Sequence, residues 1–132
     1  MTLTTEERQA IISYRIGRAF STLQEARDNA MLGHWNLVAN RLYYAVFYAG
    51  SALLLSRQFA ISSHAGFVRM FGLHFIKTGE IDIVYNKIIG ELFRMRQTGD
   101  YDDVFDLTDS DVSQYFEPVE GLLSIINSKL NL

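Results

Sequence analysis

Arginine, aspartate and tyrosine stand close together in the run Arg96-Gln97-Thr98-Gly99-Asp100-Tyr101, at the end of a strongly amphipathic segment. Glycine often follows the last turn of a helix, so we expect this helix to end near Gly99. One helical turn would bring Arg96 and Asp100 together. The alternative is an arginine that faces the helix dipole and forms an ion pair with Asp100. A guanidinium, a carboxylate and a phenol grouped at the end of one helix do not suit a hydrophobic core. Arg96, Asp100 and Tyr101 are therefore candidate catalytic residues.

A second polar set interrupts the long apolar segment between residues 36 and 57. Arg41, Tyr44 and Tyr48 follow the spacing i, i+3, i+7 and therefore share one helical face. Burying an arginine without an acceptor is costly, so a structural ion pair or an oligomer interface is the alternative to a binding site. If this face meets Arg96, guanidiniums that bind phosphate and phenols that stack on bases would line one cleft. That arrangement predicts a nucleotide or RNA ligand.

The three histidines, His34, His64 and His74, do not predict a metal site. None of them has a second ligand one helical turn away, as helical metal motifs require. His64 falls in the first turn of an expected helix, and we interpret it as a capping or packing residue. The aspartates between residues 100 and 111 lack the glycine and the terminal glutamate of a calcium loop. We therefore expect no metal and no cofactor.

The apolar pattern predicts five helices, over about residues 5–32, 36–57, 62–79, 80–97 and 108–132. Apolar residues recur at the helical period along each of them, and Thr4 with Glu7 forms a capping-box pattern at the first start. Pro118 should break the last helix near Glu117, because proline removes a helical hydrogen bond. No segment alternates with period two, as a strand would. The sequence predicts an all-α, up-and-down helical bundle that forms a single domain over residues 1–132.

Composition limits the classes of function. The chain has 132 residues, no cysteine and a net charge of −3, which excludes disulfides and thiolate chemistry and gives no overall basic surface for nucleic acid. Its longest apolar stretch, from Leu42 to Leu55, is shorter than the roughly 20 residues that a membrane-spanning helix needs. We therefore expect a cytoplasmic protein without a membrane partner.

Four segments resemble one known family. The first, Asn40-Arg41-Leu42-Tyr43-Tyr44-Ala45-Val46-Phe47-Tyr48-Ala49, resembles the second-helix signature of HEPN domains. Residues 63–66, 71–79 and 92–101 resemble a small prokaryotic branch of that family. Many members are encoded beside a minimal nucleotidyltransferase and act with it as a toxin–antitoxin pair, and many are metal-independent ribonucleases. The resemblance therefore implies a five-helix HEPN-like bundle, a homodimer, a nucleotidyltransferase partner and an RNA or nucleotide ligand.

The family's ribonuclease site is an arginine followed by a histidine four to six residues later, at the end of the fourth helix and duplicated across a dimer. Arg96 matches that arginine, whereas residues 97–103 contain no histidine, and Asp100 with Tyr101 occupies its place. Proton transfer in RNA cleavage needs a group with a pKa near neutrality. Tyrosine titrates near 10 and aspartate near 4, so the resemblance leaves open whether the chain is an enzyme.

The resemblance also gives Tyr101 a second interpretation. Partner transferases of related proteins modify a motif tyrosine with a nucleotide, so Tyr101 is a candidate acceptor. The candidate nucleotide- or RNA-binding residues are Arg41, Tyr44, Tyr48 and Arg94. The first hypothesis is an RNA-directed toxin or ribonuclease that uses Arg96. The alternatives are a non-catalytic module that binds nucleotide or the transferase, and a purely structural dimerisation module.

Overall fold

A computed structural model describes residues 2–101 and 106–130, and for residues 99–101 it describes the backbone alone. Every regular element in these ranges is helical, which confirms the predicted all-α bundle. The elements are α1 (Thr5–Met31), α2 (Trp35–Ser56), α3 (His64–Phe71), the π-helical η1 (Gly72–Ile76), α4 (Val84–Tyr101), α5 (Asp109–Val112), the 3₁₀ turn η2 (Ser113–Tyr115) and α6 (Phe116–Leu130). None of these helices is both long enough and apolar enough to cross a membrane.

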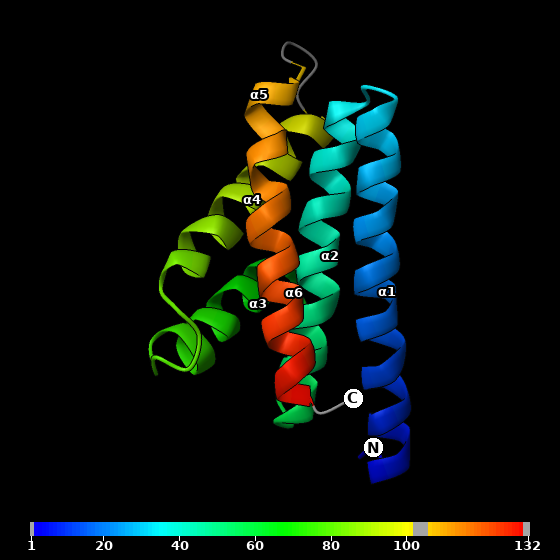
Figure 1. Cartoon of the computed structure of the whole chain (residues 1–132). Helices are drawn as coiled ribbons and strands as arrows, with labels where there is room; N and C mark the ends of the chain where they lie inside the picture. Colours follow the sequence, from blue (N-terminus) through cyan, green and yellow to red (C-terminus); the bar gives the residue numbers. More distant parts are fainter. Residues whose placement is uncertain (1, 102–105, 131–132) are drawn as a thin grey trace.

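Helix α2 is the central element of the bundle. It runs antiparallel to α1, and α6 packs along the same two helices (Figure 1). Helix α4 contacts α2 from the other side and leans away from it toward its own start, where α3 and η1 lie. The start of α1 and the end of α6 lie at the end of the bundle opposite the α1–α2 connection. The C-terminal part of α4 therefore meets the N-terminal half of α2.

Local signals explain why α1 begins and ends where it does. The predicted capping box is present: the Thr4 hydroxyl accepts from the Glu7 amide at 3.0 Å, and the Glu7 carboxylate accepts from the Thr4 amide at 2.9 Å. Gly33 follows the helix with φ of +76°, a conformation that glycine adopts without steric cost. The short turn that results places Trp35 at the start of α2, so the two longest helices become antiparallel neighbours.

The core is built on the small residues of α2 and the aromatic rings of α3 and η1. Phe67, Phe71 and Phe75 are all fully buried. A Cβ atom at Gly50 would lie 2.7 Å from Cζ of Phe67, so the two helices can pack this closely only because Gly50 has no side chain.

Helix α4 departs from its predicted bounds at both ends. It begins at Val84, four residues later than expected, because residues 79–83 form a link in which Ile81 is buried and donates its amide to the Phe75 carbonyl at 2.8 Å. The helix then continues through Gly99 to Tyr101, so the prediction that Gly99 ends it is wrong. Glycine inside a helix costs only about 1 kcal/mol relative to alanine, which does not by itself terminate one.

The last predicted helix is interrupted as expected. Helix α5 passes into the 3₁₀ turn η2 before α6 begins at Phe116. Pro118 is the third residue of α6, where the missing amide hydrogen would have no partner inside the helix. The break therefore lies just before the proline. Helix α5 begins where the Asp111 carboxylate accepts from the Thr108 amide at 2.9 Å.

Ion pairs join three elements at the end of the bundle near the chain termini. Glu80, in the link before α4, accepts from Arg57 at 2.6 Å and from Lys129 at 3.4 Å. Arg57 follows α2, and Lys129 lies in the last turn of α6. The hydrogen bond from Arg57, with the smaller contribution of Lys129, lowers the pKa of Glu80. One carboxylate thus ties α2, the link and α6 together.

Candidate functional site

Arg96 lies against a group of aromatic rings between α4 and α2. Its guanidinium carbon is 5.1 Å from the ring centre of Tyr43, 5.9 Å from that of Tyr44 and 5.8 Å from that of Phe93. Phe93 precedes Arg96 by one turn of α4, whereas the two tyrosines are neighbours on α2. Such cation–π contacts contribute about 0.5–2 kcal/mol each, more when water is excluded. Because Arg96 is only 6 % exposed, the rings hold its charge almost out of solvent.

His64 joins Arg96 from a third helix. It is the first residue of α3, whose start is fixed by the Ser63 hydroxyl accepting from the Gly66 amide at 2.9 Å. Its Nδ1 lies 2.8 Å from the Tyr43 hydroxyl, and its Nε2 lies 3.5 Å from the Tyr44 hydroxyl. We call Arg96, His64, Tyr43, Tyr44 and Phe93 the Arg96 cluster. Three helices supply its members, so it depends on the tertiary fold.

The cluster controls the protonation of its own members. Burial and, to a smaller extent, the Arg96 charge lower the pKa of His64, so the imidazole is neutral at physiological pH. Burial also raises the pKa of Tyr43, although Arg96 opposes that effect. The Tyr43 phenol therefore keeps its proton, and its oxygen can accept from Nδ1–H of His64 in the tautomer that leaves Nε2 without a proton. The cluster places a neutral imidazole beside a fixed positive charge.

Arg41 meets the cluster at Tyr44. Its guanidinium carbon is 5.4 Å from the Tyr44 ring centre, so Arg41 and Arg96 both contact this one ring. Arg41 also donates to Glu25 of α1 at 3.2 Å and, through Nε and Nη2, to Asn40 at 3.0 and 2.7 Å. The structural ion pair considered from the sequence is therefore present. It holds Arg41 at the partly exposed edge of the cluster.

The other candidate residues lie in different places. Tyr48 is one turn beyond Tyr44 on α2, with 5.9 Å between ring centres, and borders a hollow between α1 and α2. Arg94 is exposed on α4 and, being two residues from Arg96, projects about 200° around the helix from it. The side chains of Asp100 and Tyr101 lie outside the described residues. Within the described ranges, no group of histidine, aspartate and glutamate side chains could hold a metal ion.

Two residues of this region were not identified from the sequence as functional. The sequence favours a capping or packing role for His64, yet its two ring nitrogens lie within hydrogen-bond distance of the hydroxyl groups of Tyr43 and Tyr44. Arg18 of α1 lies 5.2 Å from the Tyr48 ring centre, and its position in the sequence does not indicate this contact. Local spacing carries no signal for either contact, because each depends on how two helices pack. The available hint for His64 was its place in the Ser63–Gly66 segment that resembles the family.

The lowered pKa of His64 predicts a pH dependence of stability. In the unfolded chain His64 titrates near its ordinary value of about 6.5, and in the folded protein its pKa is lower. Between these two values the unfolded state binds more protons, so the free energy of unfolding falls as the pH drops below about 6.5. Urea unfolding of the wild type and His64→Gln at pH 7.5 and 5.5 measures this. The variant should lose less stability on acidification, and equal losses would contradict the prediction.

Comparison with known proteins places the chain in a family. Residues 12–129 match the HEPN domain. A UPF0332 protein of Thermotoga maritima is 33 % identical over 120 residues, which cover 91 % of each chain. Two Methanocaldococcus jannaschii proteins carry the name "Putative toxin": one is 33 % identical over 70 % of this chain and 63 % of its own length, the other 41 % identical over 46 % of each. The match covers most of the helical bundle, and the chain belongs to the HEPN domain family.

Proposed function

We propose that this chain is an RNA-directed toxin whose site is the Arg96 cluster. The observation that carries the proposal is the meeting of Arg96 and His64 on the rings of Tyr43 and Tyr44. The names of two relatives support a toxin role. The chemistry of the cluster supports a phosphodiester substrate, because a guanidinium binds phosphate oxygens and a neutral imidazole accepts a proton near pH 7.

Each side chain has a defined role in this proposal. Arg96 stabilises the negative charge that develops on the phosphate. In the tautomer with a proton on Nδ1, His64 takes the proton of the 2′-hydroxyl group through Nε2, the nitrogen with the longer 3.5 Å contact. The 2′-oxygen then attacks phosphorus, the bond from phosphorus to the 5′-oxygen breaks, and the 5′-oxygen leaves with a proton from water. Tyr43 orients the imidazole through its 2.8 Å bond to Nδ1. Tyr44, partly exposed, offers a ring on which a base can stack. His64 thereby supplies the near-neutral group that the stretch after Arg96 lacks.

Two partners belong to the same proposal. A homodimer would present the cluster twice, and a minimal nucleotidyltransferase would act as the antitoxin. Both follow from the resemblance described above. Tyr101 remains the candidate acceptor of a nucleotide from such a transferase, and its side chain lies outside the described residues.

One observation favours a second candidate function, a non-catalytic module that binds a nucleotide or the transferase. Arg96 is 6 % exposed, so a substrate could reach it only after the rings around it move. A buried guanidinium of this kind also serves to hold α4 against α2 without taking part in a reaction. The two candidates differ in whether the protein alters RNA.

Growth arrest on expression in cells tests the proposed function. Wild-type protein should arrest growth and cleave cellular RNA, and Arg96→Ala should abolish both effects, because its charge is needed at the phosphate. Lys87→Ala is the matched control: it removes an exposed positive charge of the same helix that is not a candidate binding residue, and it should remain toxic. Circular dichroism establishes that both variants fold. Arrest that persists in a folded Arg96→Ala variant, or wild-type protein that leaves RNA intact, would overturn the ribonuclease proposal.

A further inference from the structure

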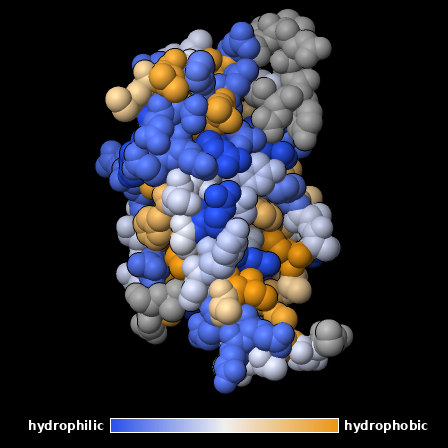
Figure 2. Space-filling model, turned by 90° about the vertical axis from the view of Figure 1, so that its right-hand side faces the viewer, coloured by the Kyte–Doolittle hydropathy of each residue, from blue (hydrophilic) through white to orange (hydrophobic). Residues whose placement is uncertain are grey.

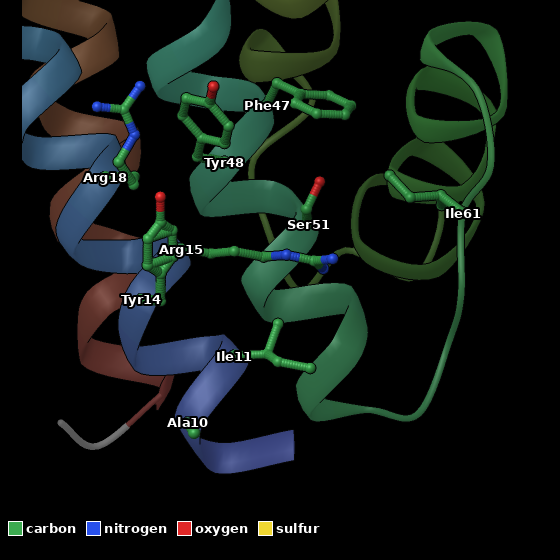
Figure 3. A pocket seen from close by; sticks show the side chains of 9 residues that line it. All are labelled: Ala10, Ile11, Tyr14, Arg15, Arg18, Phe47, Tyr48, Ser51 and Ile61. Carbon is green, nitrogen blue, oxygen red and sulfur yellow. The ribbon is translucent and has the colours of Figure 1, made fainter. Parts of the chain in front are cut away.

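A hollow of about 570 Å³ lies between α1, α2 and the link that follows α2. Arg15 of α1 reaches across it toward Ser51, and the side chains of Ile11, Phe47 and Ile61 form apolar parts of its wall (Figure 3). Volumes of about 300–1,000 Å³ are typical of sites that bury most of a small ligand, so the hollow is large enough to receive a side chain of a partner. The surface on the α1 side of the molecule shows hydrophobic patches in its lower half beside strongly hydrophilic residues (Figure 2).

Three arginines of α1, which we call the arginine row, follow the same side of the helix. Arg8, Arg15 and Arg18 share one face, because steps of seven and three residues correspond to about two turns and one turn. The row extends about 15 Å along the helix axis, since each residue advances a helix by about 1.5 Å. Within the part of the chain that the structure describes, none of the three forms an ion pair, and Glu25, whose charge acts on Arg18, is paired with Arg41. The row is therefore a local concentration of positive charge on a chain whose net charge is −3.

The charge and the shape of this face favour an acidic helix of another protein. Guanidiniums spaced along one helix face match carboxylates spaced in the same way on a facing helix, because both helices have the same rise per residue. The apolar walls of Ile11 and Ile61 suit an aliphatic side chain that lies between those carboxylates. A nucleic acid is the poorer match, because it binds through many phosphate contacts, whereas this chain is acidic overall and offers three arginines around an apolar hollow.

We propose that the arginine row and the hollow together dock an acidic amphipathic helix of a protein partner. Glutamates of the partner helix pair with the three guanidiniums, because arginine binds carboxylate oxygens bidentately. A leucine of the partner, one turn from those glutamates, enters the hollow and packs against Phe47 and Ile61. This docking surface shares no residue with the Arg96 cluster and does not depend on the function proposed for that cluster.

Fluorescence anisotropy of a labelled peptide, titrated with the whole chain, tests the proposal. The probe repeats the heptad Glu-Ala-Ala-Leu-Glu-Ala-Ala over about 21 residues, long enough to form a helix with glutamate and leucine on one face. It should bind saturably with a Kd below about 1 mM. Replacing its glutamates with glutamine, or its leucines with alanine, should each weaken binding about tenfold or more, because one change removes the charge-assisted bonds and the other the apolar contact. No saturable binding of the acidic peptide would overturn the proposal.

Variants of the chain assign the peptide to this face. Arg15→Gln and Arg18→Gln, combined in one folded protein, should weaken binding about tenfold or more. Arg27→Gln is the matched control: it removes a positive charge from the opposite side of the same helix, where Arg27 pairs with Glu120, and it should bind the peptide as the wild type does. An equal loss in the control would reduce the binding to general charge attraction and overturn the proposal.

A single-stranded oligonucleotide, titrated against the same proteins, distinguishes a nucleic acid from a protein segment. It should bind this face more weakly than the acidic peptide, and the combined change of Arg15 and Arg18 should leave its affinity nearly unchanged. An oligonucleotide that binds the wild type more tightly than the peptide, and is released by that combined change, would assign the face to nucleic acid and overturn the proposal.

Discussion

Replacing His64 with glutamine should slow RNA cleavage by a factor of about 100 to 10,000, the usual contribution of a general acid or base. Glutamine can still hydrogen-bond to the Tyr43 hydroxyl, which lies 2.8 Å from the imidazole, but it cannot take a proton from a 2′-hydroxyl group. The measurement is the initial rate of cleavage of a labelled RNA by the purified protein. This expectation depends on the proposed ribonuclease activity and is separate from the effect on stability described above.

The pH profile distinguishes proton transfer from a structural role of His64. The wild-type rate should fall on the acid side as the imidazole becomes protonated, below pH 6.5 because its pKa is lowered. His64→Gln should lose that acid limb. His74→Gln is the matched control, since His74 stacks on Phe59 with 3.8 Å between ring centres and is not part of the Arg96 cluster. A folded His64→Gln variant with the wild-type rate and profile would exclude His64 from proton transfer.

Replacing Gly50 with alanine should destabilise the fold by about 1–3 kcal/mol, the usual cost of forcing extra atoms into a packed core. The added methyl group would lie 2.7 Å from Cζ of Phe67, and the ring is fully buried. Either the ring must leave its place or α3 must move away from α2. The expected readout is a lower midpoint of urea unfolding with little change in its denaturant dependence.

Gly17→Ala is the control for Gly50→Ala. Gly17 lies in the exposed part of α1, and a Cβ atom there would have no neighbour within 4 Å. Alanine should therefore stabilise the protein by about 0.5–1 kcal/mol through its higher helix propensity. Opposite signs at the two positions would show that the effect at Gly50 comes from the Phe67 contact. A Gly50→Ala variant as stable as the wild type would mean that the ring relocates at no cost.

Much of the fold is predictable because its signals are local. The capping box of Thr4 and Glu7, the glycine after α1 and the proline in α6 each act within a few residues, and each element begins or ends near them. The predicted start of α4 is four residues too early. Ile81 fits the apolar period of the helix that follows, but its side chain is buried in the link before α4. The burial of Ile81 depends on how separate segments pack together, and the pattern within one segment does not contain that information.

The candidate site was predictable in part for the same reason. Spacing placed Arg41, Tyr44 and Tyr48 on one face of a helix, and the hypothesis that this face meets Arg96 agrees with the contacts of Tyr44. Nothing in the spacing could indicate that α3 would bring His64 to the same place. The orientation of Arg15 toward Ser51 depends likewise on how α1 packs on α2.

The carboxylate of Glu80 gives the two ends of the central helix different responses to ionic strength. Near its C-terminal end, α2 is joined to its neighbours by charges that are partly open to solvent, at Arg57, Glu80 and Lys129. Toward its N-terminal end, it is joined to α4 by a guanidinium buried among aromatic rings. Dissolved ions screen exposed charges far more than buried ones. A concentrated electrolyte would therefore weaken the ion pairs of Glu80 more than the contact of Arg96 with the aromatic rings of α2.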